Sequence, residues 1–361
     1  MSQFQLAEYL VNAGITDAQR HGEVDRSARL ENYRGGVLVR RGQLNAAVDS
    51  FQRSQVAAGV AQEPQLVASA SLNEVFSNIG RGDIASAKAI LEKMHWPLDS
   101  ELSDAGYLFR VSLARFQISS TLGESASAEQ EAALDSMRGY AKNLVSELGG
   151  RHPSSIQAMV SLCAAQRDFS AYSGDSSRLD GCVTASELAA VYANAEFGPS
   201  HYLSLTASAN FALTQFEYAR LVAPEGVEPS VEALRRSADS LASGLGADHP
   251  LAVSGAANFA LGMLELARSN GALRASRSTD IVSAFIEAAN LLAGVCVMAD
   301  SVFGELHPTT VIVYSNLAYA KFDIAQRVGS SRSWRMLPKQ PDAQQPAPRK
   351  WWARRIQQVD C

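Results

Sequence analysis

Apolar residues recur along most of this chain at helical spacing, and prolines fall between the periodic segments. Ala, Leu and Ser dominate, and few windows show the β-branched alternation typical of a strand. The pattern predicts helix nearly throughout and no sheet. Hydrophobic residues are 47% of the 361 residues, enough for two or three domains or for one elongated array.

A small residue followed four positions later by a large apolar one indicates close helix packing in the N-terminal third. The small residue admits a neighbouring helix and the large one fills the gap. Each pair follows a glycine, and the two sets are Gly42, Ala47 and Phe51, and Gly82, Ala87 and Leu91. Gly35, in the preceding predicted helix, is expected to allow the close approach in the first set.

A Gly-x-x-His turn occurs four times, and such self-similarity is typical of a stacked-repeat protein. Proline follows the histidine in three copies, whereas Tyr202 follows it in the second. Glycine can end one helix in a left-handed conformation, and proline can occupy the first turn of the next. The four copies begin at Gly149, Gly198, Gly246 and Gly304, and their histidines are His152, His201, His249 and His307.

Two further positions repeat with the turns. Asn stands nine residues after the histidine in three copies, at Asn210, Asn258 and Asn316, with Ser161 in that place in the first copy. Seven residues later the side chain is acidic in all four copies, at Asp168, Glu217, Glu265 and Asp323. Seven residues are two helical turns, so each pair is expected on one face of a helix.

The N-terminal pattern resembles the tetratricopeptide repeat, with two repeats near residues 28 to 61 and 64 to 97. The later copies, from about 106 to 328, resemble the longer repeat of kinesin light chains, which begins with a Gly-x-x-His-Pro turn and continues through an Asn-Leu-Ala helix. The resemblance implies an all-α, right-handed α-solenoid of helix pairs. We expect tetratricopeptide repeats with a helical cap over 1–100, longer repeats over 101–329 and a basic, Trp-containing disordered tail over 330–361. Extra length is expected in loops at 222–228 and 269–280 and in a long helix over 281–303.

In tetratricopeptide arrays the first helix of each repeat lines an inner groove, and Asn at this station commonly clamps the backbone of a peptide. The resemblance therefore implies a peptide-binding groove lined by Asn210, Asn258, Asn316, Asp168, Glu217, Glu265 and Asp323. Two alternatives stay open: the Asn side chains instead join repeats by hydrogen bonds, and the acids pair within their own helices. Arg220, Arg268 and Arg327 stand three or four residues after an acid, the spacing for such pairs.

The residues predict no catalytic or metal site. The four histidines lie about one repeat apart, too far to share an ion, so a turn or capping role is expected. No phosphate-binding Gly loop, HExxH sequence or Ser/His/Asp set accompanies them. Cys163, Cys182 and Cys296 are expected as buried apolar residues, since no CxxC pair occurs. We therefore expect no enzyme and no cofactor.

Charge separates the body from the C-terminal tail. Of the net charge of −5, the tail from residue 330 carries about +5 and the remainder about −10, so a nucleic-acid surface on the array is not expected. The basic and aromatic residues of the tail are Arg349, Lys350, Trp351, Trp352, Arg354 and Arg355. One hypothesis docks residues 349–356 in the acidic groove, in cis or from a second copy, in competition with a partner. The alternative is a disordered end that keeps the chain soluble.

The predicted function is a non-catalytic protein- or peptide-binding scaffold, with a basic partner favoured by the acidic groove. The alternative is a peptide sensor that signals to a separate effector through a change of array curvature. The N-terminus lacks a signal peptide, and apolar stretches such as 291–299 are about half of what a membrane span needs. A cytoplasmic location without a membrane span is therefore expected.

Overall fold

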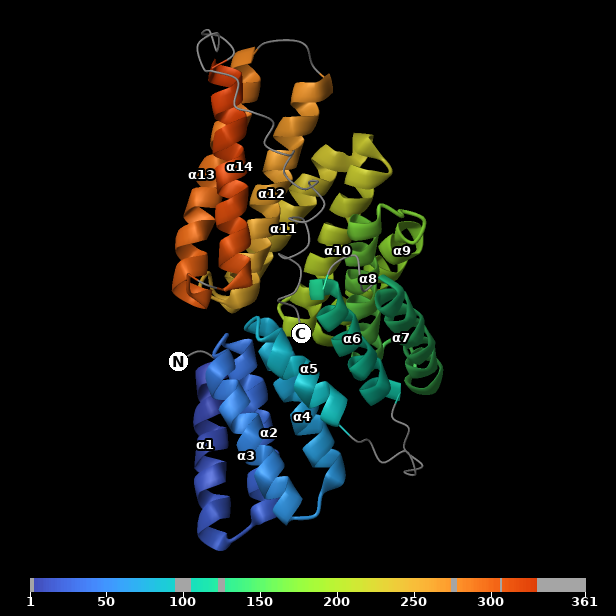
Figure 1. Cartoon of the computed structure of the whole chain (residues 1–361), viewed down its shortest axis with the longest axis vertical. Coiled ribbons are helices and arrows are strands. Elements are labelled where there is room, and N and C mark those ends of the chain that lie inside the picture. Colours follow the sequence, from blue (N-terminus) through green and yellow to red (C-terminus); the bar gives the residue numbers. More distant parts are fainter. Residues whose placement is uncertain (1–2, 95–104, 123–126, 274–277, 306, 330–361) are drawn as a thin grey trace. The chain divides into compact units, whose positions relative to one another are not determined.

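The computed structural model describes residues 3–94, 105–122, 127–273, 278–305 and 307–329. These residues form α-helices and one 3-10 turn, and no strand occurs within them (Figure 1). The helices are α1 (Gln3–His21), α2 (Val24–Arg40), α3 (Leu44–Val60), α4 (Pro64–Gly80), α5 (Ile84–Lys93), α6 (Ala105–Leu122), α7 (Ser127–Leu148), α8 (Pro153–Ser173), α9 (Leu179–Phe197), α10 (Tyr202–Leu221), α11 (Val227–Leu245), α12 (Pro250–Leu273), α13 (Ser278–Phe303) and α14 (Pro308–Gly329).

The chain divides into two compact units within α8, between Ala165 and Gln166. In the N-terminal unit each of α1 to α4 packs against the helix that follows it, α6 packs against α7, and the even-numbered α2, α4 and α6 also pack in succession. In the C-terminal unit α9 to α14 pack in the same way, with α10, α12 and α14 in succession. This is the packing of an α-solenoid, so the chain is a helical repeat protein and the predicted all-α solenoid is confirmed.

Helices α2 to α5 begin every 20 residues, at 24, 44, 64 and 84. Before each start, one residue takes positive φ: Gly22, Gly42, Gln62 and Gly82. The next N–H then reaches back five residues to a helix carbonyl, for example from Gln43 to Leu38 at 2.9 Å, which is a Schellman turn. A helix pair here spans 40 residues, longer than the 34 of the tetratricopeptide repeat. Helix α4 begins at Pro64, the residue at which the second repeat was predicted to begin.

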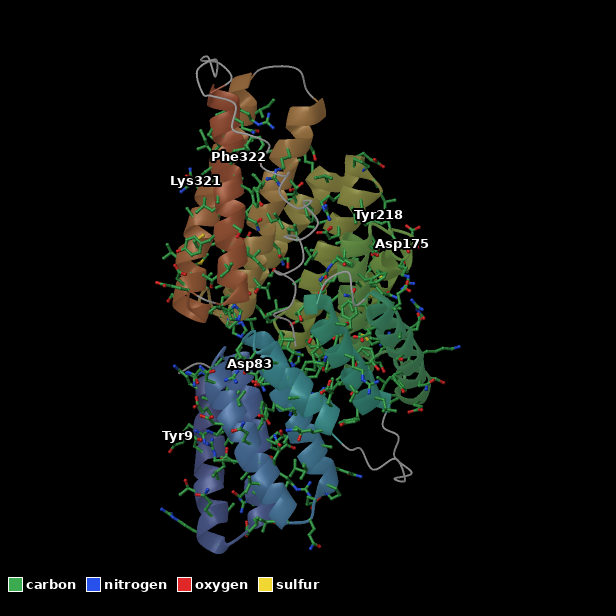
Figure 2. All side chains as sticks on the ribbon, in the orientation of Figure 1. Tyr9, Asp83, Asp175, Tyr218, Lys321 and Phe322 are labelled. Carbon is green, nitrogen blue, oxygen red and sulfur yellow. The ribbon has the colours of Figure 1, made fainter. Side chains whose placement is uncertain are left out.

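The close approach expected at Gly35 is confirmed. A Cβ at this position would overlap the ring of Phe51, whereas one at Gly36 would meet nothing. Phe51 is 1% exposed and packs with Leu38 and Ala47 in the core between α2 and α3. Asp83, labelled in Figure 2, begins α5 by accepting a hydrogen bond from the Ser86 N–H, and this bond lowers its pKa.

The C-terminal helices are long, as expected for residues 281–303. The expected loop over 269–280 is shorter than predicted, because α12 continues to Leu273 and α13 starts at Ser278. By length and composition alone, Pro250–Ser269 and Ile281–Phe303 would suffice to cross a membrane. The first segment is 61% buried and the second only 33%. The core of α12, α13 and α14 is built around Leu264, Phe285 and Leu292.

Candidate functional site

The four repeated turns are helix junctions, and the capping role predicted for the histidines is confirmed. Each turn glycine has positive φ; at Gly198 φ is 80° and ψ 160°, and at Gly246 they are 97° and 148°. These two ψ values lie outside the left-handed helical region expected from sequence, in a region that essentially only glycine adopts. Each histidine then accepts a hydrogen bond at Nδ1 from the N–H two residues later, at 3.1–3.2 Å.

A second repeated contact was missed from sequence. Three residues after the histidine, Ser155, Ser204 and Thr310 donate their hydroxyls to a carbonyl of the preceding helix, eleven residues earlier in the chain. All three are fully buried. Ala252 takes this place in the third copy. A Ser or Thr three residues after the histidine was the signal that could have revealed this contact.

The repeated Asn and acidic positions, which we call stations, lie on α8, α10, α12 and α14. Asn210, Glu217 and Asn316 are buried, at 2%, 5% and 8% exposure. The stations at Asp168, Asn258, Glu265 and Asp323 are half-buried. Because α10 packs on α12 and α12 on α14, these stations succeed one another across three helices.

The acids of α10 and α12 pair with arginine within their own helix, which confirms the local-pair interpretation for them. Arg220 donates to Glu217 at 2.6 and 2.9 Å, and Arg268 donates to Glu265 at 2.5 Å. Arg268 also donates to Asp323 of α14 at 2.8 and 3.0 Å. One guanidinium thus bridges the acids of two repeats.

Asp323 does not pair with the arginine of its own helix. Arg327, four residues later, instead places its guanidinium over the ring of Phe285, 4.5 Å from the centroid. The predicted pair of Asp323 with Arg327 is therefore wrong, and Asp323 binds Arg268 instead. The flat guanidinium of Arg327 can stack on an aromatic ring because Arg268 already binds Asp323.

The pairs form one alternating row, which we call the ion ladder: Glu217, Arg220, Glu265, Arg268 and Asp323. Burial lowers the pKa of Arg220, but the charge and hydrogen bond of Glu217, with the charge of Glu265, outweigh it and the pKa is raised. Burial likewise lowers the pKa of Arg268, and Glu265 and Asp323 together raise it. The ladder therefore largely compensates the acids that sequence suggested as a negative column.

The row continues toward α8 through a buried arginine. Arg167 is 1% exposed and donates to Asn210 Oδ1 at 3.3 Å and to Asp168 at 3.4 Å. The Asn210 amide also donates to the Thr206 carbonyl at 3.1 Å. Asn210 thus joins repeats, which is the alternative that the sequence left open for the Asn ladder. The side chains of Asn258 and Asn316 form no hydrogen bond within the part of the chain that the structure describes.

The N-terminal unit has its own polar row, which sequence reasoning missed. Asn73 of α4 donates to Asn32 of α2 at 2.9 Å and accepts from Arg110 of α6 at 2.5 Å. We call these three residues the amide ladder. Beside it, buried Glu31 accepts from Ser50 at 2.7 Å and from Arg53 at 3.0 Å. Asn32 and Asn73 are 41 residues apart, one more than the 40 residues of a helix pair, so the repeat does not align them and sequence offers no signal for their contact.

No group of three or more His, Cys, Asp or Glu that could hold a metal ion occurs among residues with described positions. The three cysteines Cys163, Cys182 and Cys296 are buried, as predicted. Burial raises the pKa of the Cys296 thiol. The predicted tail-docking residues Arg349, Lys350, Trp351, Trp352, Arg354 and Arg355 lie outside the described residues.

Comparisons with known proteins add little to this description. No protein-family model matches the chain, and no curated protein matches it. One solved structure similar to this chain is described as a circular tandem repeat protein with novel repeat topology and enhanced subunit contact surfaces. It is 15% identical, and the alignment covers 91% of this chain and 96% of that one. Its TM-score of 0.29 is too low to support an argument about fold or function.

Proposed function

We propose that this chain is a non-catalytic scaffold of tetratricopeptide type that binds an extended peptide segment of a partner protein along α10, α12 and α14. The observation that carries the proposal is the position of Asn258. Its half-buried side chain lies on α12, between the Asn stations of α10 and α14, and forms no hydrogen bond within the described residues. An amide can donate to and accept from a peptide backbone at once.

The surroundings of Asn258 suit such a role because they are held in place. Glu265, two turns along the same helix, is bound by Arg268, and Arg268 is bound by Asp323. Side chains fixed in this way lose little conformational entropy when a ligand binds. With most charge compensated, main-chain hydrogen bonds rather than net charge would supply the affinity, so a basic partner is preferred only weakly.

A library of extended peptides displayed on phage and selected against the full chain tests this proposal. Selected peptides should bind the Asn258→Ala variant about tenfold more weakly, since two lost hydrogen bonds remove roughly 1–1.5 kcal/mol. Asn290→Ala is the matched control, because Asn290 is exposed on α13. Equal loss in both variants, or no selected peptide sensitive to Asn258→Ala, would contradict the proposal.

A further inference from the structure

The last described helix, α14, is apolar on the side that faces away from the core. Its inner side places Ile312, Val313 and Ala320 in the core. Its outer side carries an exposed row at helical spacing: Val311, Tyr314, Ala318, Phe322 and Ala325. Phe322, labelled in Figure 2, is 57% exposed, and Val311 and Tyr314 are 44% and 45% exposed. Helix α14 therefore has apolar residues on two sides, of which the inner one is buried and the outer one is exposed.

The neighbouring helix extends this surface. On α13, Ile286 and Val297 are 45% and 70% exposed, with Ala293 between them. The Tyr314 hydroxyl donates to Asp300 at 2.5 Å, which ties the exposed row of α14 to α13. We call the exposed apolar residues of α13 and α14 the outer patch. An exposed apolar patch of this kind marks an interaction surface.

We propose that the outer patch is covered by the chain's own C-terminal segment, residues 349–359. In that segment Trp352, Ile356 and Val359 stand at i, i+4 and i+7, the spacing of anchors in a helix that docks on an apolar groove. Two basic residues, Arg349 and Lys350, precede the first anchor, and two more, Arg354 and Arg355, lie between Trp352 and Ile356. The segment thus offers apolar anchors and positive charge together.

The length of the chain beyond α14 permits this contact. Nineteen residues, 330–348, separate Gly329 from Arg349. They can span at most about 66 Å, while α14, at 22 residues, is only about 33 Å long. A tether of this length gives an effective concentration on the order of millimolar, so a weak contact is sufficient.

Charge favours docking of this segment on the outer patch rather than along the ion ladder. The acids of the ion ladder are already bound by arginine. Around the outer patch, by contrast, Glu287 and Glu305 are exposed and Asp300 is half-exposed, against the single exposed cation of Lys321 on α14 (Figure 2). A basic segment therefore gains more by docking there.

The same charges disfavour the other occupants. A second copy docked through a twofold axis would bring the patch against itself, with its carboxylates facing like charges. A membrane would have to accept Glu287, Asp300 and Lys321 in or near the hydrocarbon, which is costly. These occupants are outcomes of the test below.

The test uses tryptophan fluorescence of the full chain with acrylamide as quencher. The chain has four tryptophans, and two of them are Trp351 and Trp352. Of these two, only Trp352 is an anchor, so about a quarter of the emission should be shielded in the unmodified chain and become accessible in Phe322→Glu. Tyr9→Glu is the matched control, since Tyr9 is an exposed aromatic residue of α1, at 66%. It should leave quenching unchanged.

A variant in the tail checks the contact from the other side. Replacing Trp351 and Trp352 by Ser should increase the binding of anilinonaphthalene sulfonate, because the outer patch loses its cover. Complete quenching in the unmodified chain would overturn the proposal. So would shielding that appears only at concentrations where a dimer forms, or only with phospholipid vesicles. None of these readouts involves a partner peptide, so the result is independent of the proposed function.

Discussion

In the N-terminal unit, hydrogen bonds of the amide ladder join α2, α4 and α6. In the C-terminal unit, hydrogen bonds of the ion ladder join α12 to α14, and the charge of Glu265 on α12 acts on Arg220 of α10. Both ladders connect alternate helices, so both fix how one repeat sits on the next. Three of the five ion-ladder members are carboxylates, each bonded to an arginine. The ion ladder therefore depends on paired charges, whereas the amide ladder has Arg110 as its one charged member, and the difference can be tested by single substitutions.

Removing the bridging arginine should have the largest effect. Arg268→Ala leaves the half-buried carboxylates of Glu265 and Asp323 without their shared cation. We expect a loss of about 2 kcal/mol of unfolding free energy, between the value for a buried pair and that for an exposed one. Urea denaturation measures this loss, which should be greatest in the transition of the C-terminal unit.

Arg235→Ala is the matched control for Arg268→Ala. Arg235 also bonds two carboxylates, those of Glu232 and Asp239, but all three side chains are 46–65% exposed. Its loss should cost less than about 0.5 kcal/mol. If both variants lose the same amount, the ion ladder adds nothing beyond an ordinary surface pair and the contrast between the units disappears.

A neighbouring pair of glycines tests packing in the N-terminal unit. Gly35→Ala should destabilise the chain by about 1–2 kcal/mol, because the new Cβ overlaps the buried ring of Phe51. Gly36→Ala meets open space and should stabilise the helix by up to about 1 kcal/mol. Thermal unfolding of the two variants should give opposite shifts, and stabilisation of both would show that helix propensity outweighs packing at Gly35.

The histidine caps come next in size. His152→Ala removes the acceptor of the Ser154 N–H and should cost about 1 kcal/mol. His152→Asn keeps an acceptor at the cap and should recover most of that loss. Unfolding midpoints compare the stability of the two variants directly. If His152→Asn is no more stable than His152→Ala, His152 does not act as a cap.

The N-terminal turns offer a smaller, reciprocal test. Gln62 is the one non-glycine residue with positive φ among those the structure describes, at 58°. Gln62→Gly should stabilise the chain by roughly 0.5–1 kcal/mol. An L side chain at positive φ costs about 1–2 kcal/mol, and part of the stability gained by removing it is lost because glycine gives up more conformational entropy on folding. Gly82→Gln, at the matching turn, should destabilise it. Differential scanning calorimetry would reveal whether the two changes have opposite signs.

Gln62 also explains why part of the fold could be predicted and part could not. The helices and the Gly-x-x-His junctions are local, since glycine, histidine and the capped N–H lie within six residues of one another, so their pattern was visible in sequence. The 20-residue period of α2 to α5 was missed because Gln62 interrupts the series of turn glycines. The repeats predicted at 28–61 and 64–97 therefore had 34 residues each, whereas a helix pair here spans 40.

The partners within the candidate site were harder to predict than its positions. The spacing of acid and arginine predicted the bonds of Glu217 and Glu265, which lie within one helix. Asp323 instead binds Arg268, 55 residues away, and only the packing of α12 on α14 brings them together. Arg167 was missed because a charged residue in an apolar helix gives no sign of its burial until its partners are known.

The smallest expected effect concerns Tyr314, on the exposed row of α14. Its hydrogen bond to Asp300 raises the pKa of the phenol to about 12, from an ordinary value of 10. A raised folded-state pKa contributes stability that is fully present below pH 10 and is lost as the pH rises through 12. The unmodified chain should therefore be more stable than Tyr314→Phe below pH 10 and should lose this difference in unfolding free energy between pH 10 and 12. Urea denaturation of both chains across this pH range measures the difference. Replacing Asp300 by Ala removes the acceptor of the Tyr314 hydroxyl and should abolish this window.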